Sequence, residues 1–182
     1  MLKVAIMGHG TVGSGVYDVF AQNASQITRA VGEQVEVKYV LDLRDFSNLP
    51  YADKFVTDFA VIENDPEVQI VVETIGGARV AKDFTERSLR AGKSVVTSNK
   101  ELVACHGLEL TRLAREKGVC YLFEASVGGG IPIIRPLTMC LAANQMEEVC
   151  GILNGTTNYI LTRMIGAGLS FEAALKEAQE NG

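Results

Sequence analysis

Three glycines near the N-terminus have the spacing that a phosphate site requires. The residues Gly8-His9-Gly10-Thr11-Val12-Gly13 follow the apolar run Val4–Met7 and lead into a helical pattern. The first glycine allows a tight turn, the second leaves room for a diphosphate, and the third lets the helix pack closely on a strand. Because N–H groups at a helix start attract phosphate, we predict that these glycines bind a dinucleotide. A glycine turn without a ligand is the alternative, and His9 is interpreted as a loop residue.

Two charged residues, Asp42 and Arg44, follow the second apolar run. A carboxylate at this position binds the ribose 2′-hydroxyl of NAD, whereas an arginine receives the 2′-phosphate of NADP. Both residue types are present, so both cofactors stay open, and Arg44 shifts the prediction toward NADP or dual use. The alternative is that one or both charges are simply solvated in a turn.

A further glycine-containing turn, Thr74-Ile75-Gly76-Gly77, follows the third apolar run. Ligands of a doubly wound sheet collect at the carboxyl ends of its strands. We therefore expect Thr74, Ile75 and Gly76 to lie near the nicotinamide or its ribose. A plain connection between strand and helix explains the same residues equally well.

The fourth apolar run ends in the polar cluster Thr97-Ser98-Asn99-Lys100-Glu101. A lysine at a strand end beside a dinucleotide can hydrogen-bond a substrate oxygen, help to move a proton, or stabilise negative charge on oxygen during hydride transfer. The alternative is a surface lysine neutralised by Glu101. The position of Lys100 at the end of a strand favours the catalytic role.

The elements that must position these residues alternate between strand and helix. Apolar, β-branched runs predict strands, and apolar residues at helical spacing predict helices. The fold class that follows is α/β, a Rossmann-type doubly wound parallel sheet with helices on both sides. The predicted strands are Val4–Met7, Val35–Leu41, Ile70–Val72, Ser94–Thr97 and Val119–Phe123, and the predicted helices are Val16–Ile27, Val80–Arg90 and Leu108–Lys117.

The character of the sequence changes near Ser126, where Gly128-Gly129-Gly130 begins a segment with two prolines. Beyond it, the pattern predicts a strand over Glu147–Ile152 and helices over Asn158–Ile165 and Phe171–Glu180, the last capped by Ser170. We expect a dinucleotide-binding domain over residues 1–125. Residues 126–182 are too short for a second domain of ordinary size, so we expect them to be the start of an incomplete α+β domain.

The composition narrows the class of protein. Hydrophobic residues make up 47% of the 182 residues and charged residues 21%, which is typical of globular domains. The net charge of −5, with both signs interspersed, argues against a dedicated nucleic-acid binder. No run suits a membrane span or a signal peptide, so a cytoplasmic protein is expected.

The four cysteines form no C-x-x-C pair and stand in or beside apolar stretches. We expect buried free thiols rather than a zinc site. The neighbours Cys105 and His106 point in different directions on a helix or strand, which makes a catalytic dyad improbable.

Taken together, five blocks of the sequence resemble homoserine dehydrogenases, and they extend over nearly the whole chain. The last two blocks are long and specific. The blocks are Gly8–Gly13, Val72–Gly77, Thr97–Lys100, Phe123–Ile134 and Gly151–Leu161.

The resemblance implies an NAD(P)-dependent oxidoreductase that interconverts L-homoserine and L-aspartate 4-semialdehyde, in the biosynthesis of threonine, methionine and isoleucine. It places Lys100 at the reacting oxygen and implies a homodimer formed through the second domain. The residues that match cofactor-lining positions are Thr11, Val12, Ser98 and Lys100.

The resemblance also implies two sites near and beyond the glycine-rich segment. A monovalent cation, usually Na⁺, is expected on the main-chain carbonyls of Glu124, Val127, Gly129 and Ile131. A glycine-rich loop can curl its carbonyls around a hard cation, although a hinge between domains is the alternative. Asn154, Gly155 and Thr156 are expected to contact the substrate. Their alternative role is a turn before a helix capped by Thr157.

Members of this family continue beyond a residue like Gly182 into a segment with acidic groups and a second lysine, which hold the substrate and complete proton transfer. We therefore expect this chain to be a fragment that turns over slowly or not at all. The alternative function is a nucleotide-binding module without catalysis. A reductase of the same fold acting on dihydrodipicolinate is a third candidate, disfavoured by the block Asn154–Leu161.

Overall fold

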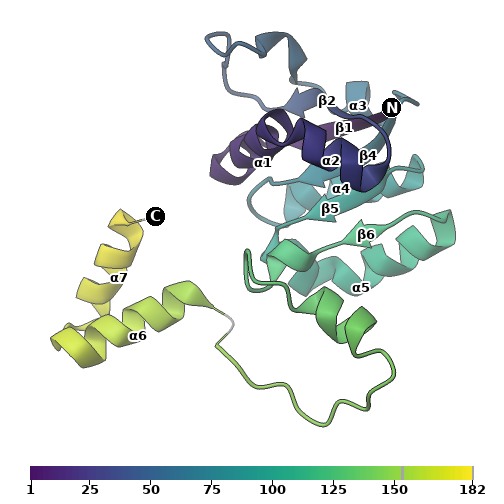
Figure 1. The fold of residues 1–182 in the computed structure, drawn as a ribbon. Helices are drawn as coiled ribbons and strands as arrows, with labels where there is room; N and C mark the ends of the chain where they lie inside the picture. Colours follow the sequence, from purple (N-terminus) through teal and green to yellow (C-terminus); the bar gives the residue numbers. More distant parts are fainter. Residues whose placement is uncertain (153, 182) are drawn as a thin grey trace. The chain divides into compact units, whose positions relative to one another are not determined.

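The computed structural model describes residues 1–152 and 154–181. The chain forms two units, Met1–Gly129 and Gly130–Gly182. The first contains a six-stranded sheet, and the second contains two longer helices (Figure 1). The division lies four residues after the expected boundary at residue 125, and the roles assigned to the two segments stay predictions.

The sheet of the first unit is parallel throughout, which confirms the predicted Rossmann-type fold. Its strand order is β3-β2-β1-β4-β5-β6. The chain starts in the middle at β1 and winds outward in both directions, so the order reverses between β1 and β4, where ligands of such sheets bind. The strands are β1 (Leu2–Met7), β2 (Val35–Leu41), β3 (Phe55–Val56), β4 (Val68–Glu73), β5 (Ser94–Thr97) and β6 (Tyr121–Leu122).

Residues of β1 alternate between two apolar clusters, one on each face of the sheet. Ala5 and Met7 belong to the larger cluster, which includes residues of the helices α3 (Ala60–Glu63), α4 (Arg79–Arg90) and α5 (Lys100–Lys117). Ile6 instead packs with Val16 and Phe20 of the helix α1 (Thr11–Gln22). This alternation follows from the twofold period of a strand. Burying each large side chain contributes about 1.5–3 kcal/mol, so β1 is firmly held and its carboxyl end is a rigid base for the glycine loop.

The helices of the first unit differ from the predictions in three places, one of which is the short helix α3, which was not predicted. The single helix expected over Val16–Ile27 is two helices that meet at Asn23. The last helix begins eight residues earlier than expected, because Asn99 caps it and accepts the Leu102 N–H at 3.0 Å. The helices are α1 (Thr11–Gln22), α2 (Ala24–Val31), α3 (Ala60–Glu63), α4 (Arg79–Arg90) and α5 (Lys100–Lys117), with 3₁₀ turns η1 (Ala52–Lys54) and η2 (Glu124–Ser126).

The second unit contains a short π-helical turn, η3 (Pro136–Cys140), followed by α6 (Gly155–Ala167) and α7 (Phe171–Glu180). Ser170 caps α7 as predicted, accepting the Ala173 N–H at 3.3 Å. The strand predicted over Glu147–Ile152 is wrong, because these exposed residues form no regular structure. A strand needs a partner to complete its hydrogen bonds, and the described part of this unit offers none.

The predicted burial of the cysteines is also wrong, since all four are exposed free thiols. Apolar neighbours do not determine which face a residue occupies. Cys120, for example, is exposed although the next residue, Tyr121, is buried. None of the helices that the structure describes is long and apolar enough to cross a membrane.

Candidate functional site

The glycine loop between β1 and α1 contains two glycines that the protein itself requires. Gly8 has a φ of +92°, and a Cβ on it would lie 2.9 Å from the Thr74 carbonyl oxygen. A Cβ on Gly13 would lie 1.9 Å from the Gly8 carbonyl oxygen. No side chain fits at these distances, so close packing of the loop explains both residues.

Gly10 is different, because a Cβ there would meet no atom within 4 Å. It precedes α1, its backbone is extended, and no side chain caps the helix. The first turn of α1 contains no acidic residue, and the first N–H groups of any helix lack partners within it. The open space at Gly10 therefore faces a positive helix end, an arrangement that suits an anion approaching the backbone closely.

Asp42 and Arg44 form a closed pair at the end of β2. The Arg44 Nε and Nη2 atoms donate to Asp42 Oδ1 and Oδ2 at 3.0 and 2.8 Å, and the Arg44 backbone N–H also donates to Oδ1. The His9 backbone N–H donates to Oδ2 at 2.8 Å. Hydrogen bonds from the Arg44 guanidinium hold the pKa of Asp42 well below its usual range. The pair joins the glycine loop to the end of β2.

A hollow of about 340 Å³ lies at the carboxyl ends of β1, β2 and β4. Its walls are mostly apolar, with the Asp42 carboxylate on one side, which suits a flat ring joined to a polar sugar. Three of the predicted residues, Gly8, Ile75 and Gly76, line it. The full lining is Gly8, Leu41, Asp42, Leu43, Thr57, Ile75, Gly76, Val80 and Phe84.

His9 points into the protein rather than lying free in the loop. Its ring makes edge-on contacts with Phe46 and Phe55, at centroid distances of 4.8 and 5.0 Å, and Nε2 lies 3.3 Å from the Tyr51 hydroxyl. The Nδ1 atom has no partner among the described residues. Burial lowers the pKa of His9 below its usual value. No sequence signal marked this role, because the aromatic partners lie beyond β2.

Two residues fasten the turn after β4. The Thr74 hydroxyl donates to the carbonyls of Met7 and Gly8, each at 2.9 Å, so it ties this turn to the end of β1. The Asn99 side chain donates to the carbonyls of Ile75 and Gly77 at 2.9 and 2.7 Å. Sequence reasoning did not single out Asn99, although its position before a lysine and an acidic residue is typical of a helix cap.

Lys100 is the first residue of α5 and is exposed. It forms no ion pair with any residue that the structure describes, so neutralisation by Glu101 is not seen there. Because β1, β4 and β5 are parallel neighbours, Lys100, which begins the helix after β5, lies at the same edge of the sheet as residues 8–13. Ser98 belongs to this edge too, through its N–H bond to the Glu73 carbonyl at 3.4 Å.

Three of the four residues expected at a cation site share one turn. The Glu124 carbonyl accepts the Val127 N–H at 3.2 Å, and Gly128 and Gly129 adopt positive φ angles of 72° and 59°. Ile131 belongs to the second unit. Within the described ranges no three His, Cys, Asp or Glu side chains group as a metal site would require, so a cation here would depend on main-chain oxygens.

Asn154, Gly155 and Thr156 lie together at the start of α6 in the second unit. The cap of this helix is Asn154, whereas the alternative interpretation had placed the cap at Thr157. Its Oδ1 atom accepts both the Thr157 N–H and hydroxyl, at 2.9 and 2.7 Å. Gly155 and Thr156 also line a hollow of about 350 Å³ between α6 and α7.

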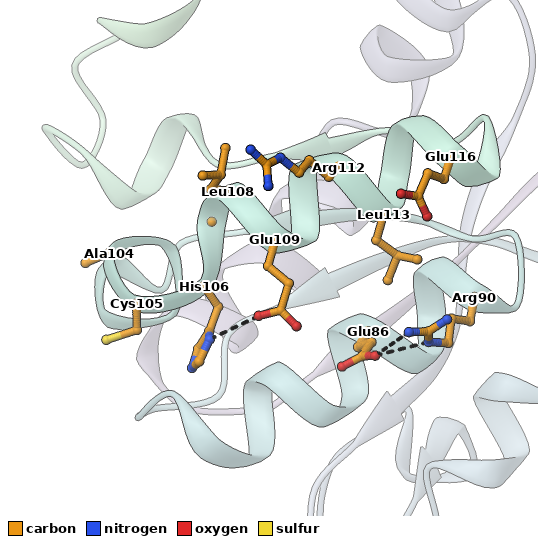
Figure 2. Close-up of a pocket in the computed structure, with 11 residues that line it drawn as sticks. Glu86, Arg90, Ala104, Cys105, His106, Leu108, Glu109, Arg112, Leu113 and Glu116 are labelled. Atoms are coloured by element: carbon orange, nitrogen blue, oxygen red, sulfur yellow. Dashed lines mark hydrogen bonds and ion pairs between the residues drawn. The ribbon is translucent and has the colours of Figure 1, made fainter.

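A larger hollow, about 470 Å³, lies along α4 and α5 (Figure 2). Its lining includes five charged side chains and none of the predicted site residues. Figure 2 shows the Cys105 and His106 side chains pointing apart, and His106 Nδ1 lies 3.5 Å from a Glu109 carboxylate oxygen. This pair is therefore not arranged as a nucleophile and its base.

Comparisons with known proteins give one consistent answer. Residues 8–124 match a family model described as the NAD binding domain of homoserine dehydrogenase, and residues 132–182 match one described as homoserine dehydrogenase. Over the whole chain, the sequence is 41% identical to homoserine dehydrogenase of Pseudomonas aeruginosa and 40% identical to that of Bacillus subtilis. The chain spans 42% of the length of each of these relatives.

Solved structures agree with the sequences. A homoserine dehydrogenase from Thiobacillus denitrificans matches the whole chain with a TM-score of 0.90 and 41% identity, the chain covering 42% of it. A hyperthermophilic archaeal homoserine dehydrogenase mutant in complex with NADPH matches with a TM-score of 0.82 and 26% identity, the chain covering 61% of it.

Proposed function

The chain belongs to the homoserine dehydrogenase family, and on that premise we propose that its first unit binds a nicotinamide dinucleotide for hydride transfer. The observation that carries this proposal is Gly10, the glycine of the loop whose missing side chain leaves only open space at the start of α1. Gly8 and Gly13 are explained by packing. Gly10 is explained by a ligand that needs the space.

The proposed binding mode follows the edge of the sheet. The diphosphate lies against the start of α1, at Gly10, Thr11 and Val12, and the adenosine half occupies the hollow beside Asp42 and Val80. The nicotinamide end extends toward Ile75, Gly76, Ser98 and Lys100, across the point where the strand order reverses. When bound, the nicotinamide supplies or accepts the hydride.

We assign NADP as the preferred cofactor, with NAD as the alternative. Arg44 is 62% exposed and can turn toward a 2′-phosphate, whereas the Asp42 carboxylate already accepts hydrogen bonds on both oxygens. A carboxylate occupied in this way is less able to select the free 2′-hydroxyl of NAD. The archaeal relative bound to NADPH supports the same assignment.

Lys100 is the proposed catalytic residue, acting on the oxygen of L-homoserine or L-aspartate 4-semialdehyde. Its ammonium group is exposed at the start of a helix, so both its charge and the helix dipole favour negative charge on that oxygen. Asn154, Gly155 and Thr156 are proposed to bind the substrate. Glu124, Val127, Gly129 and Ile131 are proposed to bind Na⁺ through their carbonyls.

The remaining proposals concern the whole protein. We assign it to the biosynthesis of threonine, methionine and isoleucine, in the cytoplasm, as a homodimer. Because the chain covers 42% of the length of its bacterial relatives, cofactor binding and turnover are tested in separate experiments. If the chain binds the cofactor but does not turn over, and the additional sequence of such a relative restores turnover, the chain acts as a nucleotide-binding module.

Two measurements test the proposed function. Titration with NADPH and with NADH, each with and without NaCl, tests binding, and we expect NADPH to bind more tightly. A hydride-transfer assay with homoserine and NADP tests turnover. In this chain, or in the chain extended by the additional sequence of a relative, Lys100→Ala should slow turnover by about 100-fold or more. Lys117→Ala, at the other end of the same helix, should leave turnover unchanged. No saturable binding of either nucleotide would overturn the proposal.

A further inference from the structure

We infer that Glu73, a buried carboxyl group outside the predicted site, positions the nicotinamide end of the cofactor site by holding its two loops together. This inference rests on the proposed function. The two loops are Ile75–Gly77, which follows β4, and Ser98–Lys100, which follows β5. Glu73 itself touches no ligand in this account and acts only through these loops.

Glu73 is the last residue of β4 and has no exposed surface. Its strand neighbours are Met7 on β1 and Thr97 on β5. Placing a carboxyl group in such a position is costly, and burial raises the pKa of Glu73. An apolar residue would serve the core better, so the contacts of the carboxyl group must account for its presence.

The two carboxyl oxygens of Glu73 contact different loops. Oε1 accepts the Ile75 N–H at 2.7 Å, which fixes the start of the first loop. Oε2 accepts the Thr97 hydroxyl at 2.5 Å. The Thr97 oxygen in turn accepts the Asn99 N–H at 2.9 Å, which fixes the second loop.

Asn99 completes the connection from the opposite side. Its amide group donates to the carbonyls of Ile75 and Gly77, and its oxygen accepts the N–H of Leu102 in the first turn of α5. The start of the helix that carries Lys100 is therefore attached to the loop after β4 by a closed ring of hydrogen bonds. Glu73 is the only member of this ring that carries a carboxyl group.

The end of β1 and the adenosine side of the proposed site are held by other contacts. Thr74 ties the end of β1 to β4, and the pair of Asp42 and Arg44 lies beside His9 at the end of β2. None of these hydrogen bonds involves the Glu73 carboxyl group. Ile75 and Gly76 also line the hollow proposed for the adenosine half, but the Asp42 side of that hollow is held by Arg44 and His9. Loosening the Glu73 carboxyl group should therefore disturb the nicotinamide end more than the adenosine end.

The test compares two ligands on three variants. NADPH spans both ends of the site, whereas adenosine 2′,5′-bisphosphate occupies only the adenosine end. For Glu73→Gln and Thr97→Val we expect NADPH affinity to fall about fivefold or more, with bisphosphate affinity changed less than about twofold. The emission of bound NADPH should also move toward that of the free nucleotide.

Thr85→Val is the matched control. It makes the same chemical change as Thr97→Val at another fully buried threonine, whose hydroxyl has no partner among the described residues. We expect it to change the affinity for neither ligand.

Three results would overturn the inference. They are an equal loss of affinity for both ligands, an unchanged NADPH affinity in Thr97→Val, or the same selective loss of NADPH affinity in Thr85→Val. Thr97→Val keeps Glu73 in place, so it decides the matter if Glu73→Gln does not fold. If the unaltered chain binds neither ligand, the proposed function fails, and the inference fails with it. If the unaltered chain binds both ligands and the variants show no selectivity, only the inference fails.

Discussion

Gly13 lies so close to Gly8 that a Cβ on Gly13 would stand 1.9 Å from the Gly8 carbonyl oxygen. The first turn of α1 thus rests directly on the end of β1. This contact fixes the loop between them, and with it the open space at Gly10. Gly13 therefore maintains the loop shape that keeps the space at Gly10 open.

The first prediction separates these glycines by substitution. Gly13→Ala should prevent folding or destabilise the protein by more than about 4 kcal/mol. Gly10→Ala should cost at most about 1 kcal/mol of stability. It should nevertheless weaken NADPH binding roughly tenfold or more, because the methyl group occupies the space of the diphosphate. Thermal unfolding and NADPH titration measure the two effects.

Gly15→Ala, in the interior of α1, is the control for these variants. A Cβ there also meets no atom within 4 Å. It should raise stability by about 0.5–1 kcal/mol through helix propensity and leave NADPH affinity unchanged. NADPH binding that is equally strong in Gly10→Ala and Gly15→Ala would argue against a diphosphate at Gly10.

The second prediction concerns cofactor preference. Arg44→Ala should weaken NADPH roughly tenfold or more, because a charge-assisted hydrogen bond contributes about 1.5–3 kcal/mol. The change also leaves the Asp42 carboxylate, which is only 10% exposed, without its cation and close to the 2′-phosphate. NADH affinity should change by less than about threefold. Arg29→Ala, an exposed arginine on α2, should alter neither affinity, and equal weakening of both nucleotides by Arg44→Ala would refute the assignment.

The third prediction uses the lowered pKa of His9. Because this pKa is lower in the folded protein than the usual value of about 6.5, the unfolded chain binds the proton more readily. The contribution of His9 to stability is therefore complete above about pH 6.5 and is lost as the pH falls below that value. His9→Phe removes the titrating group, so its Tm should fall less on acidification than that of the unaltered chain.

Thermal unfolding of both proteins between about pH 5 and pH 8 provides this comparison. At about pH 8 the imidazole is neutral in both states, so the difference in Tm there measures the changed packing together with the lost contact to the Tyr51 hydroxyl. If the two curves of Tm against pH run parallel, the protonation of His9 is not linked to folding.

Five of the six strands of the first unit could be predicted because their apolar, β-branched side chains are the ones that the sheet buries, whereas the two-residue strand β3 was not predicted. Val35–Leu41 and Ser94–Thr97 have the predicted bounds, since β-branched runs between polar turns have few alternatives. The start of α5 was missed because polar residues at a helix cap resemble a loop. The strand over Glu147–Ile152 was wrong because a local pattern does not reveal whether a partner strand exists.

The candidate site divides in the same way. Gly8, Gly10 and Gly13 were predicted because a single short motif contains the whole arrangement. The cage around His9 and the bonds of Glu73 join residues that are distant in the sequence, so no local pattern reveals them. One signal for Glu73 was present, a lone carboxyl residue closing an apolar strand.

Hydrogen–deuterium exchange with and without NADPH tests the location of the cofactor most directly. We predict slower exchange on binding over residues 8–13, 42–44, 75–77 and 98–100, and little change along the outer side of α4 and α5. Protection confined to the charged hollow on those two helices, with the glycine loop unaffected, would contradict it.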